Sequence, residues 1–309
     1  METPMRYTHF PAINRTRKPN TALGLVLLFI LALFPAQLRA FQVNFRDTVT
    51  FGDSLTHNDL LWFFSGNPKD MYGADPHEAV FDKAAIAGDD LTNYAIAGST
   101  SDDIAKQINS YDFQRSIGNQ EDATLIGFEI GGNDILNNVG LLKRFAPGEN
   151  SSADAVIDRL IANVRSSLVA LKEDHPPKTR FILWTIPDIT FTPRYFGKLT
   201  QTEEDNLRAH TERVNRLLRK ADRYSFLAVI DLYRVIQVLA VNPPTIKGQQ
   251  LQGTPVTSEY DAVFADEIHP TAVSNALLAN IIIKKVNAKW NDNIPLYSED
   301  ELAALAHIQ

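Results

Sequence analysis

Ser54, Asp266 and His269 are the residues of this sequence best suited to acyl-transfer chemistry. Ser54 lies in Phe51-Gly-Asp-Ser-Leu-Thr-His57, at the end of an apolar run. Asp266 and His269 lie in Asp266-Glu-Ile-His-Pro270, just ahead of a helical pattern. A serine nucleophile, a general base and a carboxylate that orients the base are the set of groups that attacks an ester carbonyl. We therefore expect these three side chains to be catalytic.

The three-residue spacing of Asp266 and His269 places both side chains on one face of a turn. His269 can then accept the proton of Ser54 while Asp266 fixes the tautomer of the imidazole. Pro270 suits the first position of a helix that follows. Aspartate and histidine also bind zinc, but only one histidine is present here and the sequence contains no H-x-x-x-H, so we favour proton transfer.

Two further apolar runs end in possible oxyanion donors. Gly98 closes Asn93-Tyr-Ala-Ile-Ala-Gly98, and Asn133 lies in Glu129-Ile-Gly-Gly-Asn-Asp134. Glycine lets a ligand approach backbone N–H groups closely, and Asn133 supplies a side-chain amide. Donors that converge near the nucleophile stabilise a tetrahedral oxyanion by about 3–4 kcal/mol each. Taken alone, each stretch is more often an ordinary turn.

The pattern of apolar runs predicts a parallel sheet that would position these residues. Five runs are predicted to be strands: Thr48–Phe51, Leu91–Ile96, Thr124–Ile130, Arg180–Ile186 and Leu227–Leu232. Helical periodicity indicates three helices, Ser151–Lys172, Thr202–Arg223 (with Thr202 as its N-cap) and Thr271–Trp290. Alternating strands and helices favour a parallel sheet, whose ligands gather at the carboxyl ends of the strands. Ser54 is then expected at the start of the helix after the first strand.

Two segments do not follow this alternation. Ser65–Ala87 contains two prolines and two glycines in its first half and is predicted to be a loop-rich insertion. Val241–Val263 is predicted to be a long irregular connection. Long loops either line functional sites or run over the surface, and both interpretations stay open. The remaining histidines with no partner pattern are predicted at the surface: His57, His77, His175, His210 and His307.

The amino-terminal region resembles a targeting segment. Four basic residues precede the 13-residue apolar run Ala22–Phe34, which is shorter than the roughly 20 residues that span a bilayer. This predicts a secretory signal peptide over residues 1–40, cleaved after Ala40, with an uncleaved anchor as the alternative. We expect residues 41–309 to form a single domain that is secreted or periplasmic.

The charge of the chain bears on its partners. Residues 1–40 carry five basic residues and Glu2, a net charge of +4, so residues 41–309 carry −11 against −7 for the whole chain. A strongly acidic surface argues against nucleic acid as a partner. There is no cysteine, which excludes disulfides, thiolate metal sites and cysteine nucleophiles.

The motifs together resemble the GDSL, or SGNH, hydrolase family of esterases and lipases. Its first block is matched by Phe51–Leu55, the glycine of its second by Gly98, its G-x-N-D block by Gly131–Asp134 and its D-x-x-H-P block by Asp266–Pro270. The four blocks occur in family order. The resemblance implies a flavodoxin-like three-layer α/β/α sandwich with a five-stranded parallel sheet. It also implies an oxyanion hole and no metal or organic cofactor. The oxyanion donors would be Ser54 N–H, Gly98 N–H and the Asn133 amide.

The sequence also departs from many plant-type members of that family. Thr56–Trp62 replaces their D-x-G-N stretch, and Met71–Pro76 replaces R-F-S-N-G. These changes leave the catalytic residues in place but bear on the substrate, because the second segment is expected to border the pocket. We expect a secreted serine esterase acting on a small-molecule, lipid or acylated-carbohydrate ester. An acyltransferase, a carbohydrate deacetylase and a non-catalytic lipid- or carbohydrate-binding protein are the alternatives.

Overall fold

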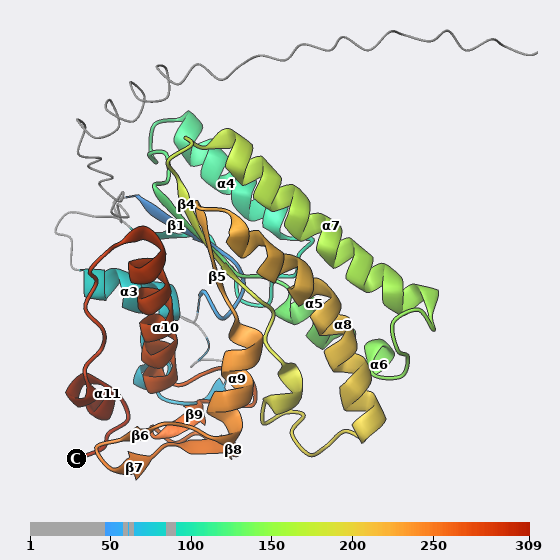
Figure 1. Cartoon of the computed structure of the whole chain (residues 1–309), viewed down its shortest axis with the longest axis vertical. Coiled ribbons are helices and arrows are strands. Elements are labelled where there is room, and N and C mark those ends of the chain that lie inside the picture. The colour runs from blue at the N-terminus through green and yellow to red at the C-terminus, as the bar shows by residue number, and fades with distance from the viewer. Residues whose placement is uncertain (1–46, 58–60, 62–64, 85–90) are drawn as a thin grey trace, which may run out of the picture. The chain divides into compact units, whose positions relative to one another are not determined.

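Five parallel strands form the central sheet of the protein (Figure 1). The computed structural model describes residues 47–57, 61, 65–84 and 91–309, and the predicted signal peptide lies outside these described residues. The strands are β1 (Thr48–Phe51), β2 (Leu91–Asn93), β3 (Leu125–Phe128), β4 (Arg180–Trp184) and β5 (Leu227–Ile230). All five lie within the ranges predicted from the apolar runs. Within the described part of the chain, no helix is both long enough and apolar enough to cross a membrane.

The strand order is β2-β1-β3-β4-β5, and every neighbouring pair is parallel. β1 therefore lies between β2 and β3, with Phe51 in register with Phe128. Because the strands are parallel, the segments that follow β1, β2 and β3 meet at one edge of the sheet. These are the three segments that carry Ser54, Gly98 and Asn133.

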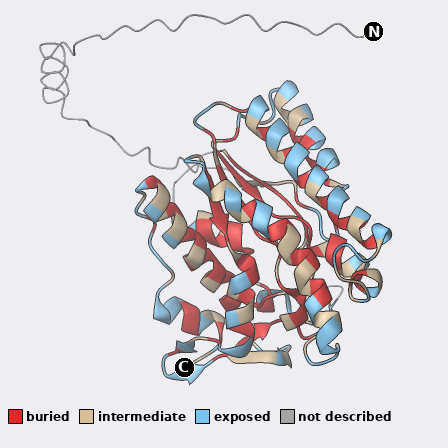
Figure 2. Cartoon of the chain, turned by 45° about the vertical axis from the view of Figure 1, so that its right-hand side comes forward, coloured by how far each residue is buried: buried red, intermediate tan, exposed pale blue. Residues whose placement is uncertain are grey.

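Side chains alternate between two cores along each strand. In β4, Phe181 and Leu183 enter one core, whereas Ile182 and Trp184 enter the other. Such strands are buried on both faces and read as continuous apolar runs, which is why the sequence pattern located them. Figure 2 shows the buried strands between two layers of helices whose outer faces are exposed.

The helices cover the sheet on both sides (Figure 1). Helices α4 (Ile104–Ser116), α7 (Ser151–Asp174) and α8 (Gln201–Lys220) pack on one core. Helices α3 (Pro76–Ala84), α9 (Leu232–Val241) and α10 (Ala272–Trp290) pack on the other. This confirms the predicted α/β fold with a central five-stranded parallel sheet flanked by helices.

The starts of two helices differ from the prediction. Helix α8 is capped by Thr200 rather than Thr202, because the hydroxyl of Thr200 accepts the N–H of Glu203 while the Glu203 carboxylate accepts the N–H of Thr200. Helix α10 is capped by Thr271, so Pro270 precedes the cap and is not the first helical residue. In both cases the capping hydroxyl satisfies a free N–H group of the first turn.

The segment predicted to be a loop-rich insertion contains a helix. Helix α3 begins at Pro76, and the side chain of Asp75 accepts hydrogen bonds from the N–H groups of His77 and Glu78 at 2.8 and 3.1 Å. The Glu78 carboxylate in turn accepts the N–H of Asp75. This is a reciprocal cap with proline at the first helical position, which the glycines and prolines of the segment obscured.

The connection predicted to be irregular contains short strands. They are β6 (Thr245–Ile246), β7 (Gln249–Gln250), β8 (Gln252–Thr257) and β9 (Ala262–Phe264), paired as β6 with β7 and β8 with β9. The remaining elements are short helices and 3-10 turns: α5 (Gly132–Asn137), α6 (Val139–Leu142), α11 (Glu299–Leu305), η1 (Lys69–Met71), η2 (Ile189–Phe191) and η3 (Ala221–Arg223).

Candidate active site

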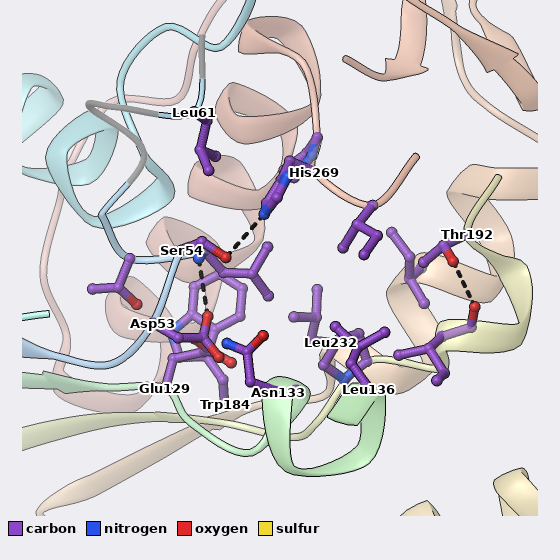
Figure 3. A pocket seen from close by; sticks show the side chains of 18 of the residues that line it. Asp53, Ser54, Leu61, Glu129, Asn133, Leu136, Trp184, Thr192, Leu232 and His269 are labelled. Carbon is purple, nitrogen blue, oxygen red and sulfur yellow. Dashed lines mark hydrogen bonds between the residues drawn. The ribbon is translucent and has the colours of Figure 1, made fainter. Parts of the chain in front are cut away.

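Ser54, His269 and Asp266 meet at the carboxyl edge of the sheet. The Ser54 hydroxyl donates to Nε2 of His269 at 2.9 Å, and Nδ1 of His269 donates to Oδ2 of Asp266 at 2.8 Å. Figure 3 shows the imidazole of His269 pointing at Ser54 across the pocket. The structure thus brings together the hydroxyl, imidazole and carboxylate that the two sequence motifs supply, although 215 residues separate Ser54 from His269.

Asp266 is held as an ionised carboxylate. Its Oδ1 accepts the backbone N–H groups of Ile268 and His269 at 2.7 and 2.8 Å, and its Oδ2 accepts the hydroxyl of Tyr72 at 3.0 Å. Burial alone would raise the pKa of Asp266. The hydrogen bond and charge of His269 and the two N–H groups outweigh burial and lower that pKa to about 2. Asp266 therefore fixes the imidazole ring with its N–H toward the carboxylate.

Ser54 lies in a turn rather than at the start of a helix. The carbonyl of Asp53 accepts the N–H groups of Thr56 and His57, which closes the turn directly after β1. Gly52 is required there, because a Cβ at this position would lie 2.3 Å from the carbonyl oxygen of Glu129. The turn is thus pressed against the end of β3.

One glutamine side chain fixes the backbone of Gly52. Gln107 of α4 accepts the Gly52 N–H at 3.0 Å and donates to the Gly52 carbonyl at 2.8 Å. The same amide donates to the hydroxyl of Ser99 at 3.1 Å. Gln107 is therefore bonded to both the nucleophile turn and the segment after β2, a link that nothing in its sequence context indicated.

The predicted oxyanion donors line the same pocket as Ser54. Gly98 has φ +83°, a conformation that favours glycine, and Asn133 donates one amide hydrogen to the carbonyl of Ser99 at 3.0 Å. Asp134 accepts the N–H and hydroxyl of Ser101, at 2.8 and 2.6 Å. These bonds tie the Gly98 segment to the start of α5, so the candidate donors are held relative to each other.

Two buried acids lie beneath the nucleophile and were not foreseen as functional. Asp53 and Glu129 are each 2% exposed, and both line the pocket. In Figure 3 the Glu129 carboxyl lies beside that of Asp53, below Ser54. Burial raises the pKa of both groups, and the adjacent charge of Asp53 raises that of Glu129 further, well above its usual 4.5. The sequence held one signal of this buried pair, because Glu129 is a lone acidic residue within the predicted strand Thr124–Ile130.

The pocket has a volume of about 300 Å³, and many of the residues that line it are apolar. The large apolar side chains of its lining include Trp184, Leu232, Ile236, Phe264 and Leu278. Of the two segments that could either line the site or run over the surface, Ser65–Ala87 contributes Pro76, and Val241–Val263 contributes none of the lining residues.

Three of the histidines predicted at the surface are buried. His77, His175 and His210 are at most 6% exposed, whereas His307 is exposed. Each buried ring has a hydrogen-bond partner distant in sequence: Trp184 Nε1 donates to His77, His175 contacts the Tyr111 hydroxyl, and His210 donates to the Phe145 carbonyl. These partners come from other elements, so the local sequence did not reveal them. Burial lowers the pKa of His77 to about 4 and keeps it neutral.

A metal site would need further ligands beside Asp266 and His269. Across residues 47–57, 61, 65–84 and 91–309, no group of three or more His, Asp or Glu side chains is arranged to hold a metal ion. The two side chains instead bond to each other, and His269 also bonds to Ser54.

A protein-family comparison matches this chain over most of its length. The model described as GDSL-like Lipase/Acylhydrolase matches residues 49–282. The matched region contains Ser54, Gly98, Asn133, Asp266 and His269. A comparison with curated protein sequences found no match.

The solved structures that resemble this chain have low sequence identity to it. The lipase Lip_vut3 from a goat rumen metagenome is 14% identical, with a TM-score of 0.50, and the match covers 81% of this chain and 100% of that one. An extracellular lipase from Streptomyces rimosus is 16% identical (TM-score 0.46; 78% and 99% covered). An acetyl xylan esterase variant from Geobacillus stearothermophilus is 14% identical (TM-score 0.46; 80% and 96% covered). The likeness to the rumen lipase shows a shared fold.

Proposed function

The chain belongs to the GDSL-like lipase/acylhydrolase family, and we propose that it hydrolyses carboxylic esters through Ser54, His269 and Asp266. Membership of this family makes the protein a hydrolase of ester bonds. The observation that carries the assignment of residues is the continuous hydrogen-bonded chain from the Ser54 hydroxyl through His269 to Asp266, with lengths of 2.9 and 2.8 Å. Both lengths lie within hydrogen-bond reach, as proton transfer from nucleophile to base requires.

The proposed reaction has two halves. Ser54 Oγ attacks the ester carbonyl while its proton passes to Nε2 of His269, and the imidazolium then protonates the departing alcohol. In the second half, His269 takes a proton from water, and the resulting hydroxide attacks the acyl-enzyme. His269 then returns the proton to Ser54 as the acid leaves. Asp266 stays ionised throughout and stabilises the imidazolium.

The tetrahedral intermediates need donors for their oxyanion. Ser54 N–H, Gly98 N–H and the second amide hydrogen of Asn133 are our candidates, because all three residues line the pocket around the Ser54 hydroxyl. The bond from Asn133 to the Ser99 carbonyl fixes the plane of this amide before substrate arrives. Donors that are already oriented require no rearrangement when charge develops.

The shape of the pocket favours an apolar acyl group. Apolar surface is offered by the lining residues Trp184, Leu232, Ile236, Phe264 and Leu278. A volume of about 300 Å³ is at the small end of ligand pockets. We propose short to medium acyl chains as substrates. Leu232→Trp would fill this space, so it should lower kcat/KM for an octanoate ester far more than for an acetate ester.

Hydrolysis of p-nitrophenyl esters of graded chain length tests the proposal directly. Ser54→Ala should reduce kcat on the order of 10⁶-fold, the size of effect that loss of a serine nucleophile has in other enzymes. A fluorophosphonate probe should label Ser54 in the wild type and leave Ser54→Ala unlabelled. Ser152→Ala, at an exposed serine in the first turn of α7, is the matched control and should change neither result. Equal ester hydrolysis by the wild type and Ser54→Ala would refute the assignment.

We also propose that the protein acts outside the cytoplasm. The support is the basic region followed by the apolar run Ala22–Phe34. Expression of the full chain followed by amino-terminal sequencing of the exported protein should give a start at Phe41. Recovery of uncleaved protein from the soluble cytoplasmic fraction alone would contradict export.

A further inference from the structure

Glu129 and Asp53 form a buried pair of acids between the nucleophile and the oxyanion segment. Asp53 belongs to the turn that carries Ser54, and Glu129 directly follows β3, four residues before Asn133. Both side chains are 2% exposed and face the pocket. Figure 3 shows the two carboxyl groups side by side, with Ser54 above them and Asn133 to one side.

The surroundings of Glu129 provide no adequate partner for a carboxylate. Among the described residues, no donor makes a hydrogen bond of good geometry with either of its side-chain oxygens. The polar groups that act on its pKa are the carboxyl and the backbone N–H of Asp53. Two ionised carboxylates in contact and shielded from water repel each other and cannot hydrogen-bond, so one proton must reside between them.

Asp53 is the member of the pair that has its own donor. Its Oδ1 accepts the N–H of Leu55 at 3.1 Å. Ionised Asp53 is further favoured by a positive charge on His269 and opposed by the charge of Asp134, which are the other titratable groups that act on it in the described part of the chain. The proton is therefore better placed on Glu129, from which an O–H can donate to the neighbouring carboxyl group of Asp53.

We propose that protonated Glu129 is a positioning residue that fastens the nucleophile turn to the end of β3, and so sets the distance from Ser54 to the oxyanion donors. The two segments already approach closely at Gly52, where a Cβ would lie 2.3 Å from the carbonyl oxygen of Glu129. Loss of the proton would place two negative charges at this contact and push the Ser54 turn away from Asn133. This inference rests on the proposed esterase function.

Two substitutions at Glu129 separate hydrogen bonding from charge. Glu129→Gln keeps a donor toward Asp53 and removes the titration, so kcat at pH 7 should stay within about threefold of the wild type. Glu129→Leu removes the donor, so kcat should fall on the order of 10²-fold with KM little changed, because a displaced nucleophile slows chemistry rather than binding. Glu173→Gln, at an exposed glutamate of α7, is the control and should behave like the wild type.

The pH dependence of kcat gives a readout that a purely structural role would not change. The wild type should lose activity at alkaline pH as Glu129 gives up its proton, whereas Glu129→Gln should lack this loss. Identical alkaline profiles for the two proteins would overturn the proposal, as would full activity of Glu129→Leu.

Infrared spectroscopy tests whether Glu129 carries a proton, and it does so independently of catalytic activity. The wild type and Ser54→Ala should show the carbonyl band of a protonated carboxyl group at pH 7, and Glu129→Gln should lose it. Persistence of the band in Glu129→Gln would overturn the assignment of the proton to Glu129. A wild type that shows the band but hydrolyses no ester would refute the proposed function and, with it, the positioning role, while leaving the shared proton established.

Discussion

The hydroxyl of Tyr72 donates a 3.0 Å hydrogen bond to Oδ2 of Asp266, the oxygen that also accepts Nδ1–H of His269. Tyr72 precedes helix α3, 194 residues before its partner. Burial raises the pKa of Tyr72, and the charge of Asp266 raises it further, so this hydroxyl keeps its proton. Tyr72 therefore completes the hydrogen-bond shell of the carboxylate that orients the base.

Tyr72→Phe should weaken catalysis without abolishing it. The variant removes one donor from Asp266 and leaves the two backbone donors in place, so we expect kcat to fall about tenfold, equivalent to about 1.4 kcal/mol. KM should change little, because Tyr72 is not among the residues that line the pocket. Tyr260→Phe removes a hydroxyl that bonds to Asp70 and serves as the control. Unchanged kcat in Tyr72→Phe would show that Asp266 does not need this donor.

Asp266→Asn should lower kcat far more than Tyr72→Phe does. An amide at this position can favour the wrong tautomer of His269 and cannot stabilise the imidazolium, and the corresponding change in a well-studied serine protease lowers kcat about 10⁴-fold. Because the pKa of Asp266 is about 2, the wild-type carboxylate stays ionised across the range above about pH 3. Steady-state kinetics from pH 5 to 9 should therefore show the defect of Asp266→Asn at every pH.

Glu129→Gln should change how stability depends on pH. In the unfolded chain Glu129 releases its proton near pH 4.5, but in the folded protein its pKa is raised. Between these two pKa values the folded state holds more protons, so the wild type loses unfolding free energy as pH rises. The unfolding free energy of Glu129→Gln, relative to that of the wild type, should therefore be higher at pH 8 than at pH 4. Urea unfolding at both pH values measures this, and a difference independent of pH would contradict it.

Asp75→Ala should destabilise the protein through the start of helix α3. The Asp75 side chain is 1% exposed and accepts two N–H groups of the first helical turn. Loss of such a cap costs about 0.5–2 kcal/mol, and burial places this one at the upper end. Ser298→Ala removes the cap of α11 at an exposed site and should cost less. Equal losses in urea unfolding would show that burial of the cap is unimportant.

The central sheet was predictable because four of its strands, β1, β3, β4 and β5, are almost entirely buried, whereas only β2 is half-buried. Runs such as Leu227–Ile230 have no polar position that a helix pattern would supply, and their order along the chain indicated parallel pairing. The serine motif and the Asp-x-x-His motif were also recognisable, because the residues of each motif are close together in sequence. The rule that ligands gather at the carboxyl ends of parallel strands placed Ser54, whereas its meeting with His269 and Asp266 was expected from the chemistry that the three groups share.

The parts that sequence reasoning missed depend on distant partners. Tyr72 acquires its role from Asp266, Gln107 from Gly52, and His175 from Tyr111, and no local pattern connects the members of these pairs. Helix α3 is a different case. A recognisable pattern for the start of a helix is present in Asp75, Pro76 and Glu78. The surrounding glycines and prolines were given more weight than this pattern.

The separation of 215 residues between Ser54 and His269 also has a consequence for biosynthesis. During translation Ser54 emerges from the ribosome long before His269 has been added to the chain. Chains fold progressively from the amino-terminal side as they emerge. The serine of a growing polypeptide is therefore inert until almost all of the chain has been translated. Hydrolytic activity can arise only once the segment that carries His269 and the helices after it have been made.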